Sequence, residues 1–272
     1  MSAKPEYLLG HSDQEIERLQ LQAECLEGLT RRLIRECGIA FGMRVLDLGT
    51  GVGDVAMLVA ETVGPKGAVV GVDAEEHAVA AARRRAKEAG LNQIEFVAGT
   101  DQDLEKLGPF DAAIGRLVLI HQPDPVATIG RVAKAVRSGG IVAFLEAAAH
   151  VRPPMMPELP LNRAASDSVF KLFRVALPNY DIAGRIIPCF LDAGLPEPRV
   201  LWESIVPGSD MKYLRWFVHM YQTLLPLMER FGVVDPVVGD PATLQDRLIE
   251  EWRPTRAQGA TPPYASAWAI RP

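Results

Sequence analysis

Cysteine is scarce in this chain of 272 residues: there are three, Cys25, Cys37 and Cys189, and no two of them stand in a C-x-x-C spacing. An odd, widely spaced set argues against a disulfide framework and against a structural zinc site. Long apolar runs are absent as well, because none approaches the roughly 18 to 20 residues of a membrane span. Residues 1–13 show no secretory signal pattern. These absences predict a cytoplasmic protein without a membrane partner.

A basic surplus is also missing, since Lys and Arg total 29 against 34 for Asp and Glu, which gives a net charge of −5. Nucleic-acid binders usually carry a basic excess or a basic stripe, so this balance argues against a nucleic-acid partner. Apolar residues make up 48% of the chain, which is too much for a disordered protein and enough for a sizeable core.

Glycine and proline are distributed unevenly along the chain. Residues 1–150 hold 17 of the 23 glycines and 5 of the 21 prolines, which suits the tight loops of an α/β domain. Residues 151–272 hold all four tryptophans and 13 of the 18 aromatic residues. Large aromatic side chains amid irregular backbone suit the wall of a substrate pocket, although they suit the second half of a core equally well.

Short apolar runs alternate with helical patterns in the first half of the chain. Residues 12–15 fit a capping box before a helix that stops at Gly38, and Ser138-Gly139-Gly140 is interpreted as a turn into the fifth strand. Strands that alternate with helices predict a parallel sheet covered on both faces. The predicted strands are residues 44–48, 68–72, 94–98, 110–114, 141–145, 199–206 and 264–270; the predicted helices include 75–89, 125–136, 181–191 and 211–231.

The segment with the most chemical content is Val45-Leu-Asp-Leu-Gly49-Thr-Gly51-Val-Gly53, which lies between the first strand and a helix. Glycines there let a ligand approach the backbone, and the helix presents unpaired N–H groups. A dinucleotide fingerprint needs a glycine where this chain has Asp54, and the Gly-Lys-Ser/Thr of a P-loop is absent. An acid two residues before G-x-G-x-G instead resembles the first motif of class I S-adenosylmethionine-dependent methyltransferases.

Further segments follow in the order that this family has them. Val69-Val-Gly-Val-Asp73 ends a strand on a carboxylate suited to both ribose hydroxyls. Residues 96–104 resemble the adenine-binding loop of the family, with the adenine contact open between Thr100 and Asp101. Residues 110–125 resemble the segment beside the sulfonium in ubiquinone-biosynthesis-like methyltransferases, and Ser138-Gly139-Gly140 matches their turn before the fifth strand.

The resemblance implies a Rossmann-like α/β fold: a seven-stranded, mostly parallel sheet with its last strand antiparallel, helices on both faces and a helical cap. It implies S-adenosylmethionine as cofactor, S-adenosylhomocysteine as product, and methyl transfer to O, N or C of a small-molecule acceptor such as a secondary metabolite or a quinone-like compound. The cofactor-binding residues that it implies are Tyr7, Gln22, Asp47, Gly49, Thr50, Gly51, Gly53, Asp73, Ala74, Thr100, Asp101, Gln102, Arg116 and His121.

His121 is the predicted catalytic residue, because a histidine with an ordinary pKa of about 6.5 accepts protons near neutral pH. Glu146 ends the fifth strand, where it either orients substrate or only binds backbone. The predicted substrate-binding residues are Glu146, Phe170, Phe173, Trp216, Phe217 and Tyr221. No cluster of acidic ligands accompanies Asp124, so no metal is predicted.

We therefore expect a single domain of residues 1–272, with a cofactor-binding core at 41–150. Residues 1–40 would form an N-terminal helical cap, and 151–272 would supply substrate cap segments and the terminal strands. A monomer and a homodimer both remain open. Two other classes also remain open: a nucleotide-dependent oxidoreductase, which the missing glycine at position 54 disfavours, and a non-catalytic cofactor-binding protein.

Overall fold

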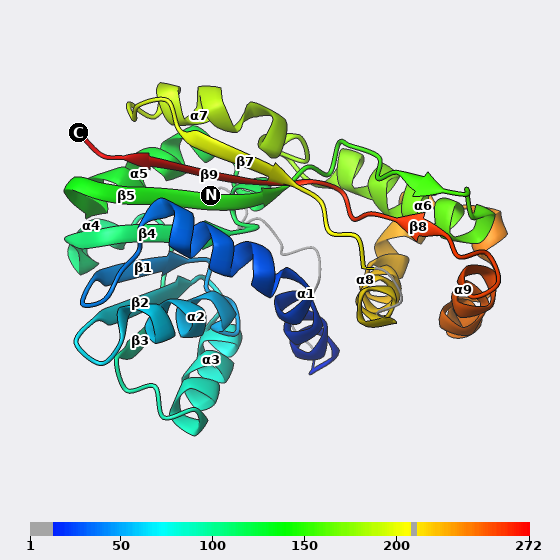
Figure 1. The fold of residues 1–272 in the computed structure, drawn as a ribbon, viewed down its shortest axis with the longest axis horizontal. Coiled ribbons are helices and arrows are strands. Elements are labelled where there is room, and N and C mark those ends of the chain that lie inside the picture. The colour runs from blue at the N-terminus through cyan, green and yellow to red at the C-terminus, as the bar shows by residue number, and fades with distance from the viewer. Residues whose placement is uncertain (1–12, 208–210) are drawn as a thin grey trace.

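The centre of the molecule is one seven-stranded sheet in the order β3-β2-β1-β4-β5-β9-β7 (Figure 1). The computed structural model describes residues 13–207 and 211–272. Strand β9 runs antiparallel to both of its neighbours, β5 and β7, while the other pairs are parallel. The predicted mostly parallel sheet with an antiparallel last strand is therefore confirmed. The strands are β1 (Arg44–Leu48), β2 (Ala68–Asp73), β3 (Ile94–Ala98), β4 (Phe110–Arg116), β5 (Val136–Ala147), β7 (Arg199–Glu203) and β9 (Tyr264–Ile270).

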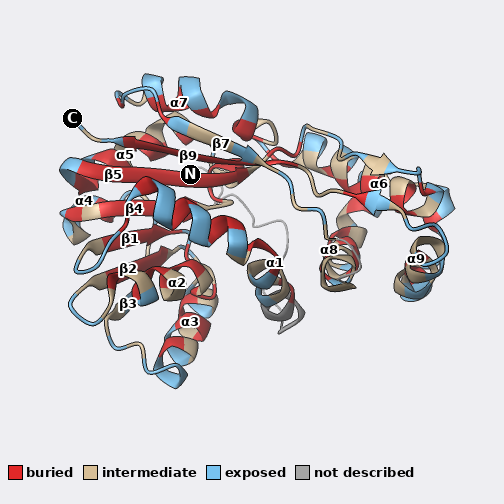
Figure 2. Ribbon diagram, in the orientation of Figure 1, coloured by how far each residue is buried: buried red, intermediate tan, exposed pale blue. Residues whose placement is uncertain are grey.

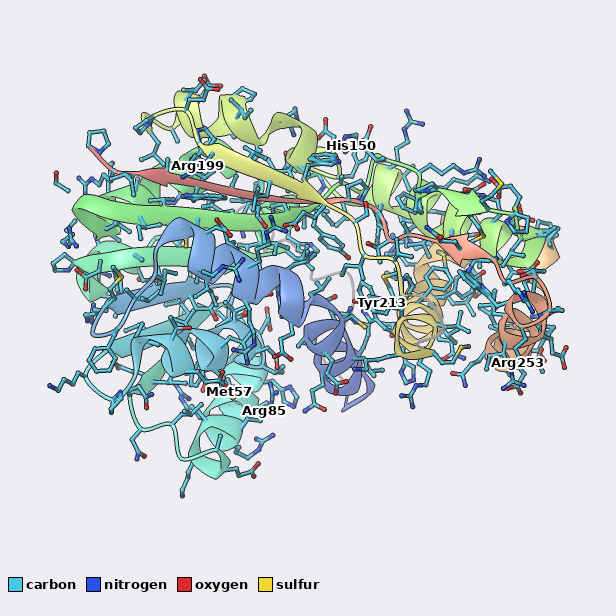
Figure 3. All side chains as sticks on the ribbon, viewed as in Figure 1. Met57, Arg85, His150, Arg199, Tyr213 and Arg253 are labelled. Atoms are coloured by element: carbon cyan, nitrogen blue, oxygen red, sulfur yellow. The ribbon has the colours of Figure 1, made fainter. Side chains whose placement is uncertain are left out.

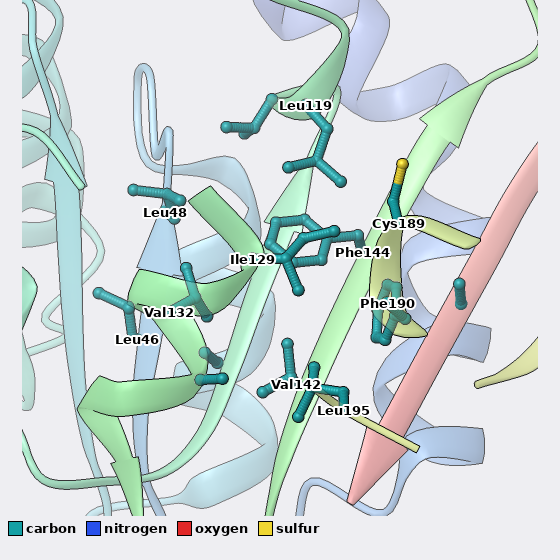
Figure 4. Packing of buried hydrophobic residues seen from close by; sticks show 14 of the residues in the cluster. Leu46, Leu48, Leu119, Ile129, Val132, Val142, Phe144, Cys189, Phe190 and Leu195 are labelled. Carbon is teal, nitrogen blue, oxygen red and sulfur yellow. The ribbon is translucent and has the colours of Figure 1, made fainter. Parts of the chain in front are cut away.

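Helices cover both faces of this sheet because alternate residues along a strand point to opposite sides. In β5, Ile141 and Ala143 join the core under α1 (Asp13–Cys37), α2 (Asp54–Val63) and α3 (Glu76–Glu88). Val142 and Phe144 join the core under α4 (Leu104–Leu107), α5 (Pro125–Ala135) and α7 (Ile186–Asp192). Figure 4 shows this second core, where the rings of Phe144 and Phe190 meet edge to face at 6.2 Å. Strands buried on both faces explain the continuous apolar runs in the sequence.

A smaller helical lobe lies beyond the carboxyl edge of the parallel strands (Figure 1). It consists of α6 (Pro160–Ala176), α8 (Met211–Arg230), α9 (Leu244–Trp252) and the two-stranded sheet of β6 (Met155–Met156) and β8 (Gln258–Gly259). Its own core is built from α6, α8 and α9 (Figure 2). Helix α1 packs on α8, and the Tyr213 hydroxyl donates to the Cys25 carbonyl at 2.6 Å (Figure 3). The lobe is thus tied to the N-terminal helix.

Local structure departs from the sequence predictions at several places. Ser138-Gly139-Gly140 does not form a free turn: it lies inside β5, which begins at Val136 and shifts register against β4 at this point. Strand β7 stops at Glu203, three residues before the predicted end. Helices α6 and α9 were not predicted. They lie in the proline-rich part of the sequence, and their apolar faces pack within the lobe. In the described ranges, no helix is both long and apolar enough to cross a membrane.

Candidate active site

The sheet order reverses at β1, which lies between β2 and β4. Ligands of open α/β sheets bind at such a reversal, outside the carboxyl ends of the strands. The loop of residues 49–53 leaves β1 at this point and leads into α2. Its first two N–H groups, those of Gly49 and Thr50, donate to the Val72 carbonyl of β2 at 2.8 and 3.0 Å. The glycine loop is therefore held against the ends of two strands.

The three glycines of this loop have different surroundings, although all have positive φ angles. A Cβ atom at Gly49 would clash with the Val118 side chain, and one at Gly53 would lie 2.9 Å from the Phe96 ring. At Gly51 a Cβ atom would have nothing within 4 Å of it. Packing therefore requires the first and third glycines. The second borders open space, which a ligand can occupy.

Asp47 lies beneath the loop and is 1% exposed. Its Oδ2 accepts a hydrogen bond from the Thr50 hydroxyl at 2.7 Å. Its Oδ1 is buried and has no hydrogen-bond partner among the described residues. Burial raises the pKa of this carboxyl to about 7. An unsatisfied buried oxygen is costly, so a donor or cation on a bound ligand would be favoured here.

Asp73 ends β2 beside the same loop. Its Oδ2 accepts from the Gly51 N–H at 2.8 Å, and its Oδ1 accepts from the Glu75 N–H at 3.0 Å. Burial raises its pKa, and the neighbouring Ala74 is exposed. Each carboxylate oxygen has a second lone pair, so Asp73 can still accept hydrogen bonds from two hydroxyls of a ligand.

Asp101 does not have the environment expected of an adenine contact. Its Oδ2 accepts from the Thr128 hydroxyl at 2.6 Å and from Arg131 Nη2 at 2.5 Å, both on α5. This carboxylate therefore anchors the loop after β3 to α5. Thr100 and Gln102 on either side of it are exposed, which leaves them as the loop side chains open to a ligand.

Arg116 ends β4 next to the glycine loop. Its Nη1 donates to the Thr30 hydroxyl of α1 at 3.1 Å, and its charge interacts with Asp47 and Asp54. Burial lowers the pKa of its guanidinium. The residue thus connects α1 to the strand ends that surround the loop. Tyr7, another predicted contact, lies outside the described residues.

Glu146, predicted as a substrate-binding residue, is fully buried at the end of β5 and is not among the residues that line the cavity described below. Its carboxylate accepts from the N–H groups of Val118, Leu119 and Ile120 at 2.9, 2.7 and 3.3 Å. These groups belong to the turn after β4 that carries His121. Glu146 is therefore a positioning residue for that turn, which is the second of the two roles that the sequence left open.

Burial raises the pKa of Glu146 to about 7 from 4.5, so its folded-state pKa lies above its unfolded value. Between those values the folded protein binds more protons than the unfolded chain. The free energy of unfolding of the parent should therefore fall, relative to that of Glu146→Gln, by at most about 3 kcal/mol as pH rises through this window. Urea denaturation of both proteins across this pH range measures the difference. Parallel pH curves would contradict the prediction.

A cavity of about 230 Å³ lies between the carboxyl edge of the sheet and the helical lobe. Its lining is mostly apolar, and Asn162, Arg163 and Ser166 of α6 are polar residues on the lobe side. Four of the predicted aromatic residues line it, namely Phe170, Phe173, Trp216 and Phe217. Tyr221, the fifth predicted aromatic residue, does not line it: it is fully buried in the lobe core, where α6 packs on α8.

The segment after β4 separates the glycine loop from this cavity. Val118 contacts the loop at Gly49, while Leu117, Ile120 and His121 line the cavity. Burial and the nearby Arg18 cation lower the pKa of His121 to about 4, which leaves the imidazole neutral near pH 7. The predicted position of His121 is thus compatible with a role in the site, but its basicity is much lower than the sequence suggested.

Arg18 and Gln22 line the cavity from α1. Arg18 is 1% exposed, and its Nη1 donates to Gln22 Oε1 at 2.9 Å. Gln22 was predicted as a cofactor-binding residue, and Arg18 was not predicted as a site residue. The signal in the sequence was an arginine at helical spacing from the buried Cys25 and Leu29, which is a cation on an otherwise apolar face. In the described part of the chain, no group of three or more His, Cys, Asp or Glu residues is placed to hold a metal ion.

Comparison with known proteins gives a family and a set of relatives. Residues 39–181 match the family described as methyltransferase domain. A demethylmenaquinone methyltransferase of Lactococcus lactis is 29% identical over 52% of this chain and 53% of its own length. The aklanonic acid methyltransferase DauC of a Streptomyces species is 34% identical over 46% of this chain and 57% of its own length. The chain thus matches about half the length of these curated relatives.

Solved structures show the same fold. The YcgJ protein of Bacillus subtilis covers 90% of this chain and 98% of its own, with a TM-score of 0.59 and 19% identity. A SAM-dependent methyltransferase of Aquifex aeolicus covers 63% of this chain and 82% of its own, with a TM-score of 0.50 and 20% identity. The family match spans the glycine loop, Asp73, the loop after β3 and the turn after β4. The chain belongs to the methyltransferase domain family.

Proposed function

We propose that this protein transfers a methyl group from S-adenosylmethionine to a small, largely apolar acceptor. The observation that carries the proposal is that one short segment, residues 117–121, has a possible ligand space on each side. On one side the glycine loop has open space at Gly51, and on the other side lies the apolar cavity. Such an arrangement suits a cofactor and an acceptor that meet at the segment between them.

The residues around the loop fit S-adenosylmethionine. Asp47 offers an unsatisfied carboxylate oxygen to a cationic ligand. Asp73 can accept hydrogen bonds from the ribose hydroxyls, and the exposed Thr100 and Gln102 lie on the loop that would meet the adenine. Arg116 is placed beside the same loop for a carboxylate group of the ligand. There is no pyrophosphate in this cofactor, which agrees with a loop that lacks the third glycine of a dinucleotide site.

When bound, the cofactor would supply an electrophilic methyl group on its sulfonium. The chain would then have to align the acceptor with that methyl and exclude water. The apolar walls from α6 and α8 suit both tasks. Glu146 would hold the turn that forms the boundary between the two spaces. A neutral His121 would act as a hydrogen-bonding partner of the acceptor.

The acceptor class follows from the cavity and from the two relatives, whose names refer to a quinone and to an acid. We propose an aromatic or quinone-like secondary metabolite, methylated on O, N or C. A cytoplasmic location is proposed because the three cysteines are buried and form no disulfide, as in a reducing compartment. We keep the division into cap, core and substrate segments as part of this proposal, and the protein would act as a monomer or homodimer.

Two aromatic residues four positions apart on α8 test the acceptor site. Phe217 lines the cavity, whereas Tyr221 is buried in the lobe core. Phe217→Leu should lower kcat/KM for an accepted substrate by about 10-fold, because a contact of the cavity wall worth roughly 1–2 kcal/mol is lost. Tyr221→Phe should leave it within about 3-fold. Steady-state kinetics measures both, with cofactor affinity as a common reference; equal effects would place the acceptor elsewhere.

The experiment that tests the proposed function uses S-adenosylmethionine with an isotopically labelled methyl group. The purified chain is incubated with a panel of phenols, quinones, aromatic acids and amines, and products are searched for label by mass spectrometry. Label in one acceptor class supports the function. Binding of the cofactor without label in any acceptor would favour the non-catalytic alternative, and binding of NAD instead would favour an oxidoreductase.

A further inference from the structure

Two polar side chains of α6 line the cavity and have no hydrogen-bond partner in the protein. Asn162 and Ser166 are 9% and 8% exposed. The backbone N–H of Asn162 donates to Glu251, but in the described ranges neither its side-chain amide nor the Ser166 hydroxyl bonds to another residue. A buried polar group without a partner is costly, so a ligand that hydrogen-bonds to this pair would be favoured in the cavity.

Both residues lie on the face of α6 that borders the cavity. Residues four positions apart share a helix face, and Phe170 continues the row that Asn162 and Ser166 begin. Phe173, also on this face, lines the cavity as well, whereas Leu172 lies on another face and packs into the lobe core. The cavity wall formed by α6 therefore changes along the helix, from polar at its N-terminal end to aromatic toward its C-terminal end.

Contacts at the two ends of α6 fix which end of the cavity is polar. At the N-terminus, two N–H groups donate to the Glu251 carboxylate of α9 at 2.7 and 2.9 Å, and α9 lies far from the sheet (Figure 1). Just beyond the C-terminus, the Asn179 amide donates to the Gln122 carbonyl, which follows the turn after β4. At about 1.5 Å per residue, Ser166 lies roughly 15 Å from the last residue of the helix, Ala176. The polar pair is thus remote from that turn.

The polar end of the cavity suits a neutral group. Arg163 lies next to the pair, but its Nη2 and Nε donate to the two carboxylate oxygens of Glu158 at 2.7 and 2.8 Å, which neutralises its charge. In the described part of the chain, no Asp or Glu lines the cavity. A side-chain amide and a hydroxyl each offer both a donor and an acceptor. Together they match an uncharged oxygen substituent of a ligand.

Resting on the proposed function, we propose that Asn162 and Ser166 recognise a neutral hydroxyl or carbonyl oxygen at the end of the acceptor opposite to its methylated atom. The acceptor is then an elongated, largely apolar molecule with an oxygen substituent at its far end. Its apolar middle packs on Phe170 and Phe173. The bond to the far oxygen decides which end of the molecule meets the methyl group, so the pair determines specificity and takes no part in the chemical step.

Equilibrium dialysis of the full chain, saturated with S-adenosylhomocysteine, tests this inference with two symmetric probes. One is biphenyl with a hydroxyl group at both para positions, and the other carries a methyl group of similar size at each of these positions. Because both probes are symmetric, the direction in which they bind does not affect the comparison. The preference of the parent for the dihydroxy probe should fall by about 10-fold in the double variant Asn162→Leu, Ser166→Ala, the scale of one or two neutral hydrogen bonds. Ser166→Ala alone should cause part of this fall.

Ser168→Ala is the matched control on the same helix. The Ser168 hydroxyl donates to the Ala164 carbonyl and accepts from the Asp235 N–H, both at 2.9 Å, so it belongs to the lobe core. This variant should lose stability, measured by thermal denaturation, and keep the preference of the parent. A preference that the double variant and Ser166→Ala leave unchanged, an equal fall in Ser168→Ala, or binding of neither probe would overturn the inference. Failure of the parent to bind S-adenosylhomocysteine would instead mean that the proposed function itself is wrong.

Discussion

Gly51→Val should weaken binding of S-adenosylmethionine by about 100-fold or more, because its side chain would fill the open space that the cofactor needs. In the unliganded protein a Cβ atom at this position meets nothing within 4 Å. The first side-chain atom of a substitution here therefore meets open space, and the backbone is strained at a φ of +53°. Isothermal titration calorimetry measures the loss.

A glycine far from the loop provides a matched control for that strain. Gly90 follows α3 with a φ of +69°, and a Cβ atom there would also have nothing within 4 Å of it. Gly90→Val should cost a comparable amount of stability, roughly 1–2 kcal/mol, and leave cofactor affinity unchanged. If Gly51→Val folds and binds the cofactor as the parent does, the open space at this glycine is not the cofactor site.

Asp73→Ala should weaken cofactor binding by about 10- to 150-fold, the range expected when hydrogen bonds to a charged group are lost. The variant loses the acceptor for ribose hydroxyls and the bond that holds the Gly51 N–H at 2.8 Å. Asp73→Asn should lose less, because one amide oxygen remains as an acceptor. Calorimetric titration with S-adenosylhomocysteine measures these affinities.

Asp235 in the helical lobe is the control for the loss of a local backbone contact. Its Oδ1 accepts from the Val237 N–H two residues on at 3.0 Å, as Asp73 accepts from Glu75. Asp235→Ala should therefore lower stability without changing cofactor affinity. An affinity that is unchanged in Asp73→Ala would remove this carboxylate from the cofactor site.

The strands and the glycine loop were predictable because their signals are local. A buried parallel strand is a short apolar run, and a loop that needs positive φ angles shows its glycines directly. Asp73 was predictable for the same reason, since a residue that follows a strand must lie at the edge of the sheet. These signals positioned the cofactor site without knowledge of side-chain contacts.

The roles of Asp101, Glu146 and Tyr221 were not predictable, because each depends on contacts far away in the sequence. The partner of Asp101 is Arg131 on α5, and Glu146 accepts from N–H groups of residues 118–120. Phe217 and Tyr221 lie one turn apart on α8, yet Phe217 lines the cavity and Tyr221 is buried in the lobe core. Neighbouring aromatic side chains on one helix thus acquire different roles from tertiary packing.

The lowered pKa of His121 has the same origin. Its cause is burial together with a cation from α1, 103 residues earlier in the chain at Arg18. Neither cause has a signal near residue 121. A sequence analysis can therefore place a histidine beside a reaction centre, while its protonation state depends on the assembled site.

The central claim is that the glycine loop binds S-adenosylmethionine, and its most direct test is calorimetric titration of the purified parent chain with S-adenosylhomocysteine and, separately, with NAD. We expect saturable binding of S-adenosylhomocysteine at one site per chain, lost in Gly51→Val and kept in Gly90→Val, and no binding of NAD. Binding of NAD in its place, or binding of S-adenosylhomocysteine that Gly51→Val leaves intact, would contradict the account.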